Sequence, residues 1–149
     1  METKDNFKVP KWSFAALGLV LVCLMSCRPV EELKPEEWPT DRIERITGVR
    51  LPEYEVTRFF LGPVMLMGDF TDTLYIEFES IPSDDLFEKI DTLSTIIGWH
   101  KSDSIHYSYY KTWGNGYPAP EGEDPEQDRI FEIYITKGEK TGIITYGMW

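Results

Sequence analysis

Hydrophobic and polar residues alternate along several short segments in the second half of the chain. Between Thr73 and Ser80, Leu74, Ile76 and Phe78 fall on one side and polar residues on the other. A period of two residues indicates a β-strand with one buried face. The same analysis predicts four further strands, at residues 54–61, 104–111, 130–136 and 141–148.

A spacing of three or four residues replaces this alternation between Ser83 and Gly98. One apolar stripe is then formed by Leu86, Ile90, Leu93 and Ile97, which predicts a helix that begins at Ser83 and stops at Gly98. A shorter helix is expected over residues 42–47. Its start is a capping box formed by Asp41 and Glu44, and its stop is Gly48.

The order of these elements is a short helix, two strands, a long helix and three strands. This order predicts an α+β fold: a two-layer sandwich with a mostly antiparallel sheet of about five strands, covered by one main helix. Five strands are too few for a membrane barrel, which needs at least eight. A chain of 149 residues favours one domain, which we expect to span residues 40–149.

The N-terminal segment has the layout of an export signal. Its first twelve residues are polar and carry three lysines, and Ser13–Met25 is a continuous apolar run. That run is shorter than the roughly 20 residues of a membrane-spanning helix. We expect residues 1–26 to be a signal peptide. Residues 27–39, rich in proline and glutamate, are expected to be a solvated tether.

The sequence Leu24-Met25-Ser26-Cys27 resembles the lipobox of bacterial lipoproteins. The resemblance implies cleavage before Cys27, a diacylglyceryl group on its thiol and an acyl chain such as palmitate on its amino group. Several acyl chains on one residue anchor a protein durably. Two other interpretations stay open, namely an uncleaved signal anchor and ordinary cleavage that leaves Cys27 free.

The lipoprotein resemblance also implies a location in the cell envelope. Arg28, directly after Cys27, is not the aspartate that retains some lipoproteins at the inner membrane, so the outer membrane is expected. Its periplasmic and surface faces both remain possible. In overall style the domain is similar to small lipoproteins of Bacteroidetes, a likeness that transfers no functional residues.

The charge of the chain excludes one class of partner. Asp and Glu number 26 against 15 Lys and Arg, a net charge of -11, and no basic run follows Lys11. Nucleic-acid binding depends on clustered Lys and Arg. We therefore expect the membrane, through the lipid anchor, and an envelope protein or glycan as partners, and no nucleic acid.

The sequence contains no recognisable catalytic constellation. Its two histidines, His100 and His106, lack the spacing of metal ligands, and no nucleophile elbow or phosphate-binding loop is present. We expect no cofactor, no metal and no catalytic residue. An enzyme that acts on envelope carbohydrate through Glu77, Glu79 or His106 is the alternative, and a passive structural lipoprotein is a third reading.

Aromatic residues are the one unusual feature of the domain. If the predicted strands are neighbours, Tyr75, His106, Tyr110 and Tyr134 share one face of the sheet. Trp113 and Tyr117 stand at the base of the long loop 112–128, beside that face. Exposed Tyr and Trp are typical of interaction surfaces. The residues thus form a candidate binding surface, unless the rings pack against the loop or the short helix.

Overall fold

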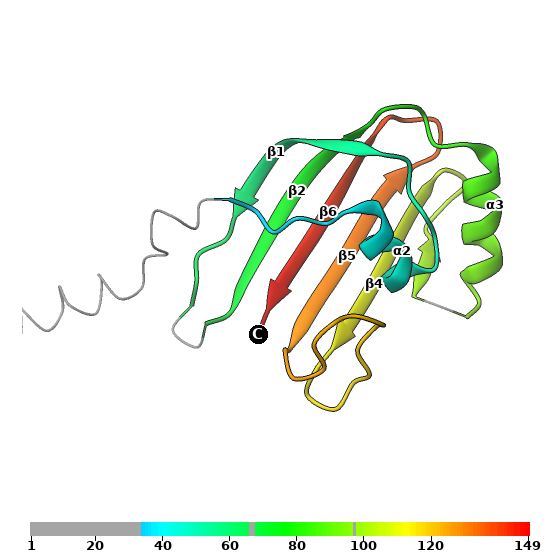
Figure 1. Cartoon of the computed structure of the whole chain (residues 1–149). Coiled ribbons are helices and arrows are strands. Elements are labelled where there is room, and N and C mark those ends of the chain that lie inside the picture. Colours follow the sequence, from blue (N-terminus) through cyan, green and yellow to red (C-terminus); the bar gives the residue numbers. More distant parts are fainter. Residues whose placement is uncertain (1–33, 66–67, 97) are drawn as a thin grey trace, which may run out of the picture.

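The computed structural model describes residues 34–65, 68–96 and 98–149, which form one antiparallel six-stranded sheet and two helices (Figure 1). The strand order across the sheet is β1-β2-β6-β5-β4-β3. In chain order, the elements are α2 (Thr40–Thr47), β1 (Tyr54–Leu61), β2 (Phe70–Phe78), α3 (Asp84–Leu93), β3 (Trp99–Lys101), β4 (His106–Trp113), β5 (Arg129–Thr136) and β6 (Thr141–Met148).

The predicted α+β class is confirmed, but the sheet has six strands rather than about five. The additional strand is β3, which has three residues and pairs with β4 at one edge of the sheet. A strand of three residues is too short to show an alternating pattern. Both predicted helices are present, but α2 has eight residues and α3 has ten, so neither is clearly the main one.

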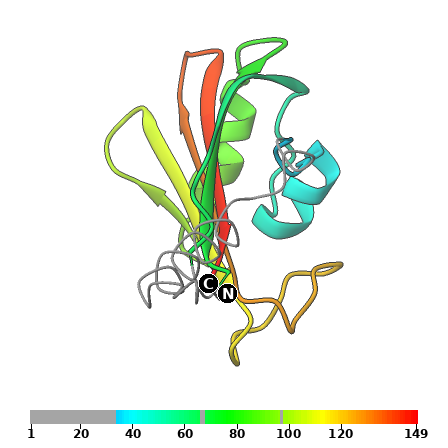
Figure 2. The same ribbon diagram turned by 90° about the vertical axis from the view of Figure 1, so that its left-hand side faces the viewer.

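One face of the sheet carries the hydrophobic core. Leu74, Ile76 and Phe78 of β2 are buried there, as the alternation predicted. Core residues of α2 and α3 pack against the same face, and Phe87 of α3 contacts Tyr107 of β4 with ring centroids 4.9 Å apart. Figure 2 shows α2 and the long loop 114–128 on this side of the sheet. We call it the covered face.

Two aromatic residues of the sheet fix the end of α2. The Tyr109 hydroxyl donates to the carbonyl of Ile46 at 2.6 Å, and the Trp99 indole donates to the carbonyl of Thr47 at 3.0 Å. These carbonyls belong to the last turn of the helix and have no partner within it. Gly48 then ends the helix in the left-handed conformation, as predicted. Burial raises the pKa of Tyr109 to about 12.

The start of α2 differs from the prediction. The helix begins at Thr40, so Asp41 lies in its first turn and forms no capping box. Its carboxylate instead pairs with Arg45 one turn later, at 2.9 Å. Arg45 lowers the pKa of Asp41 through this hydrogen bond.

The end of α3 also differs from the prediction. The helix stops at Leu93, and Gly98 directly precedes the edge strand β3 instead. Its carbonyl accepts a hydrogen bond from the amide of Tyr110 at 3.0 Å. A Cβ atom at position 98 would lie 2.2 Å from the Tyr110 carbonyl oxygen. Glycine is therefore required at position 98, because the backbone of Tyr110 lies too close to leave room for a side chain. A sequence pattern does not distinguish this role from a helix stop.

The described part of the predicted tether, residues 34–39, packs on the domain. Trp38 is buried between Phe131 and Tyr146, with ring centroids at 4.5 and 5.2 Å. The Glu36 amide donates to the Tyr146 hydroxyl at 2.7 Å. The packed domain thus begins before Thr40. Neither helix of the described residues has the length and apolar character needed to cross a bilayer.

Arg42 joins this segment, α2 and the long loop. Its guanidinium forms two hydrogen bonds of 2.8 Å with Glu123 of the loop and one of 2.7 Å with Glu36. It also stacks on the Trp38 ring at 3.9 Å. Glu36 also pairs with Arg129 at 2.8 Å. The resulting network has four charged side chains: Arg42, Glu123, Glu36 and Arg129. Both carboxylates raise the pKa of Arg42. The network holds the loop on the covered face.

Arg42→Ala should lower the free energy of unfolding by about 2 kcal/mol. It leaves Glu123, which is largely buried, without its partner and removes the stacking on Trp38. Arg45→Ala, which breaks an exposed pair on the same helix, should cost less than about 0.5 kcal/mol. Urea unfolding of both variants measures the difference. Equal effects would contradict a structural role for the network.

Candidate functional site

The second face of the sheet has no cover among the described residues. Tyr110 and Tyr134 are 45% and 46% exposed there, and Phe60 is 61% exposed. The two helices and segment 34–39 all pack on the covered face. An antiparallel sheet commonly exposes one face, but that face is then mostly polar. Here aromatic and aliphatic side chains stand among the threonines and other polar residues of the strands. We call this second face the open face.

A row of paired residues crosses the whole open face. On adjacent strands, Tyr75 lies opposite Ile143, which lies opposite Tyr134. The pairing register extends this row to all six strands, in the order Arg58, Tyr75, Ile143, Tyr134, Ser108 and His100. We call these six residues the cross-strand row. Because neighbouring strands lie about 4.8 Å apart, the row is roughly 24 Å long.

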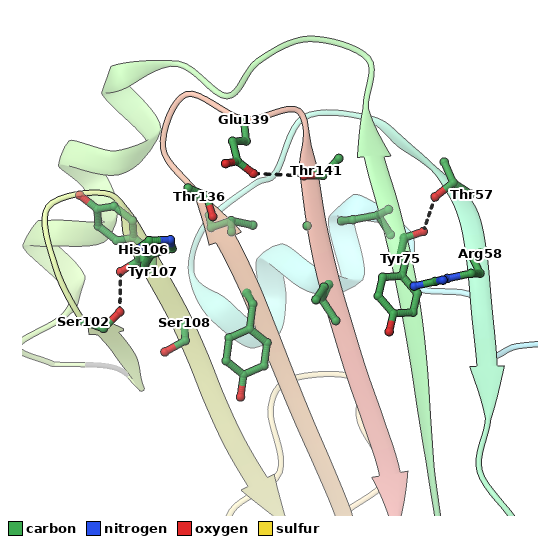
Figure 3. A pocket seen from close by; sticks show the side chains of 15 residues that line it. Thr57, Arg58, Tyr75, Ser102, His106, Tyr107, Ser108, Thr136, Glu139 and Thr141 are labelled. Atoms are coloured by element: carbon green, nitrogen blue, oxygen red, sulfur yellow. Dashed lines mark hydrogen bonds between the residues drawn. The ribbon is translucent and has the colours of Figure 1, made fainter.

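A groove of about 650 Å³ lies along the cross-strand row (Figure 3). Tyr75, Ile143 and Tyr134 line its middle, and polar groups surround them. These polar groups come from Thr57, Arg58, Ser102, His106, Ser108, Thr136, Glu139 and Thr141. An apolar centre with a polar rim is the usual composition of a binding surface.

The aromatic rings in the groove are held in place. The Arg58 guanidinium lies over the Tyr75 ring at 3.9 Å (Figure 3), and the Thr57 hydroxyl donates to the Tyr75 carbonyl at 3.1 Å. On β5, the Tyr134 hydroxyl donates to a Glu132 carboxylate oxygen at 3.2 Å. Partial burial and the Glu132 charge raise the pKa of Tyr134. Both rings are therefore already ordered before a partner binds, so binding costs them little conformational entropy.

His106 lies at one end of the groove and pairs with Asp103. Its Nδ1 lies 2.7 Å from Asp103 Oδ2, while Asp103 Oδ1 accepts the backbone amides of Ile105 and His106 at 2.9 Å. These hydrogen bonds lower the pKa of Asp103 to about 2. Asp103 thus orders the β3–β4 turn and orients the His106 ring. The sequence analysis did not single out Asp103.

The groove offers little for glycoside hydrolysis. That reaction uses two carboxyl groups that flank the scissile bond. Glu139 is the only acid that lines the groove, while Glu77 and Glu79 are exposed and are not part of its lining. Within the described residues, no group of three or more His, Cys, Asp or Glu side chains could hold a metal ion.

Four of the six predicted surface residues lie together on the open face, and two do not. Tyr75, His106, Tyr110 and Tyr134 are on the open face. Trp113 is on the covered face and only 2% exposed, because β4 continues to Trp113 in alternation with Tyr107 and Tyr109. Tyr117 is 64% exposed in the turn that follows, where it bridges to Gly114.

In comparisons with protein-family models, curated proteins and solved structures, no match to this chain was found.

Truncation at Trp113 and at Tyr134 should lower the stability of the domain by very different amounts. Trp113→Ala should cost about 3–5 kcal/mol of unfolding free energy, because it leaves a large cavity in the core. Tyr134→Ala removes a half-exposed side chain and should cost less than about 1 kcal/mol. Denaturant titrations of both variants provide the measurement. A larger loss for Tyr134→Ala would contradict the assignment of the two faces.

Proposed function

We propose that this chain is a lipid-anchored protein of the cell envelope that binds another envelope component through the open face and catalyses no reaction. The observation that carries the proposal is the uncovered cross-strand row, with Tyr75, Ile143 and Tyr134 at its centre. Burying apolar and aromatic surface of this kind is favourable, and an exposed surface of this kind commonly marks a binding site.

The composition of the row supports a role in recognition. Tyr and Arg are enriched in protein interfaces and dominate their binding energy. The stacked pair Arg58–Tyr75 and the braced Tyr134 present such groups on a rigid sheet. A sheet changes shape little on binding, so the cost of ordering the site is small.

The shape of the open face favours an envelope protein as the partner, with a glycan as the second candidate. The row crosses all six strands and is broad and shallow, which suits a protein surface. A glycan would use the same tyrosines and the hydroxyl and carboxylate groups at the rim of the groove. An envelope protein is therefore the expected occupant of the open face.

The anchor part of the proposal rests on the sequence around Cys27. The signal-like segment and the lipobox resemblance support cleavage before Cys27, lipidation and a place at the outer membrane. Cys27 precedes the first described residue, Lys34, by seven positions. An acidic domain of this kind would be held at a bilayer by acyl chains and not by charge.

Cross-linking in living cells tests the binding surface. A photoreactive phenylalanine derivative at Tyr134 should link to one discrete envelope component on illumination. The same group at Glu88, exposed on α3, should give no such product. Tyr75→Ala should reduce the yield at position 134, since it removes the other tyrosine of the row, on the far side of Ile143.

The nature of the linked product separates the candidates. A protease-sensitive product indicates a protein partner, and a product that only glycan-degrading enzymes remove indicates a glycan. Equal labelling at positions 134 and 88, or none at either, would contradict the proposed surface. Mass spectrometry of the membrane fraction tests the anchor separately, because an unmodified Cys27 would overturn it.

A further inference from the structure

An apolar patch covers the end of the domain where the chain enters it. Phe60, Met65 and Trp149 are 61%, 61% and 62% exposed there. Together with the half-buried Phe70 and Met148, they line a hollow of about 480 Å³. We call these five residues the apolar end. Among the described residues, Asp69 is the one with a charged side chain in the lining of the hollow.

The apolar end adjoins the first described residue. Lys34 lines a second hollow with Val64, Phe70 and Met148, so the two hollows share Phe70 and Met148. Figure 1 shows the entry of the chain and the β1–β2 turn on the same side of the sheet. Lys34 lies seven positions after Cys27, and the chain between them can span at most about 25 Å. A lipid on Cys27 therefore keeps this end close to the bilayer.

Acidic residues lie at both ends of the sheet. Strands β1, β2 and β6 run between the apolar end and an opposite end that carries many acids. Exposed acids at that opposite end are Glu55, Glu77, Glu79, Asp84, Asp85 and Glu139. The end that holds Trp149 also carries the acidic loop between β4 and β5, so contact with an anionic membrane surface has to be supplied by the apolar side chains and not by charge.

We propose that the apolar end is a second, protein-borne contact with the lipid bilayer, in which Trp149, Phe60 and Met65 enter the interface between headgroups and acyl chains. The inference rests on the proposed lipid anchor, which supplies proximity. Tryptophan favours this interface because its ring is apolar and its N–H is polar. The strands, about 26 Å long, then point away from the membrane, and the groove stays accessible to a partner in the aqueous phase.

Fluorescence quenching of Trp149 in vesicles provides the test. The other described tryptophans, Trp38, Trp99 and Trp113, are at most 3% exposed and lie in the core. The difference between the emission of the wild-type chain and that of Trp149→Phe therefore isolates Trp149. The lipidated protein is placed in vesicles of phosphatidylethanolamine and phosphatidylglycerol whose acyl chains carry bromine near the headgroup.

The expected result is loss of most of the Trp149 emission, together with a shift of that emission to shorter wavelength. The double variant Phe60→Ser, Met65→Ser should restore much of the emission, because it weakens insertion without touching the core. Trp149 that stays unquenched in protein that floats with the vesicles would overturn the inference and leave the anchor intact. A blue shift without quenching would also overturn it, since it indicates a protein contact such as a second copy.

Failure of the protein to float would overturn the proposed anchor instead. The apolar end is then tested on the Cys23→Ser variant, in which Cys27 is the only cysteine. Coupling Cys27 to a maleimide lipid supplies the proximity that acylation would have given. Quenching of Trp149 in that sample supports the inference, and its absence overturns it.

Discussion

The packing of an aromatic layer against one face of the sheet holds this domain together. Trp99 and Tyr109 bond the last carbonyls of α2, and Trp38 inserts between Phe131 and Tyr146. These contacts join segments that are far apart in the sequence. They satisfy backbone groups that would otherwise be buried without partners, and they bury large apolar area at the same time. Each helix is short and would be unstable without this layer.

The same layer explains why the other face is left open. The N-terminal segment, both helices and the long loop are all needed on the covered face, where Arg42 ties three of them together. No described element remains to cover the second face. The exposure of the cross-strand row is therefore a property of the fold itself. The proposed recognition function follows from this row, because a bound partner would bury its apolar side chains.

The sequence predicted the five longer strands of the sheet but not the three-residue edge strand β3. In β2, β5 and β6 one side of each strand is buried, so alternation with a period of two revealed both the strand and its face. The edge strand β3 escaped detection because it has three residues. Gly98 was misread as a helix stop, because close approach to Tyr110 leaves no separate mark in the sequence.

The candidate site was likewise predicted only in part. Tyr75, His106, Tyr110 and Tyr134 were placed on one face by counting along the strands, and the register confirms this. Trp113 was assigned to the loop because the predicted strand ended two residues too early, whereas the continued alternation buries it. The cross-strand row could not be predicted, because it depends on which strands are neighbours. A single sequence gives strand faces but not strand order.

The most direct measurement of the central claim compares tyrosine nitration in purified protein and in intact cells, read by mass spectrometry. In purified protein, Tyr110 and Tyr134 should react, whereas Tyr107, Tyr109 and Tyr146, at most 3% exposed, should not. In cells, a partner on the open face should protect Tyr134 while Tyr117, in the exposed turn, stays reactive. Equal reactivity of Tyr134 in both samples would contradict the account, because the open face would then have no occupant.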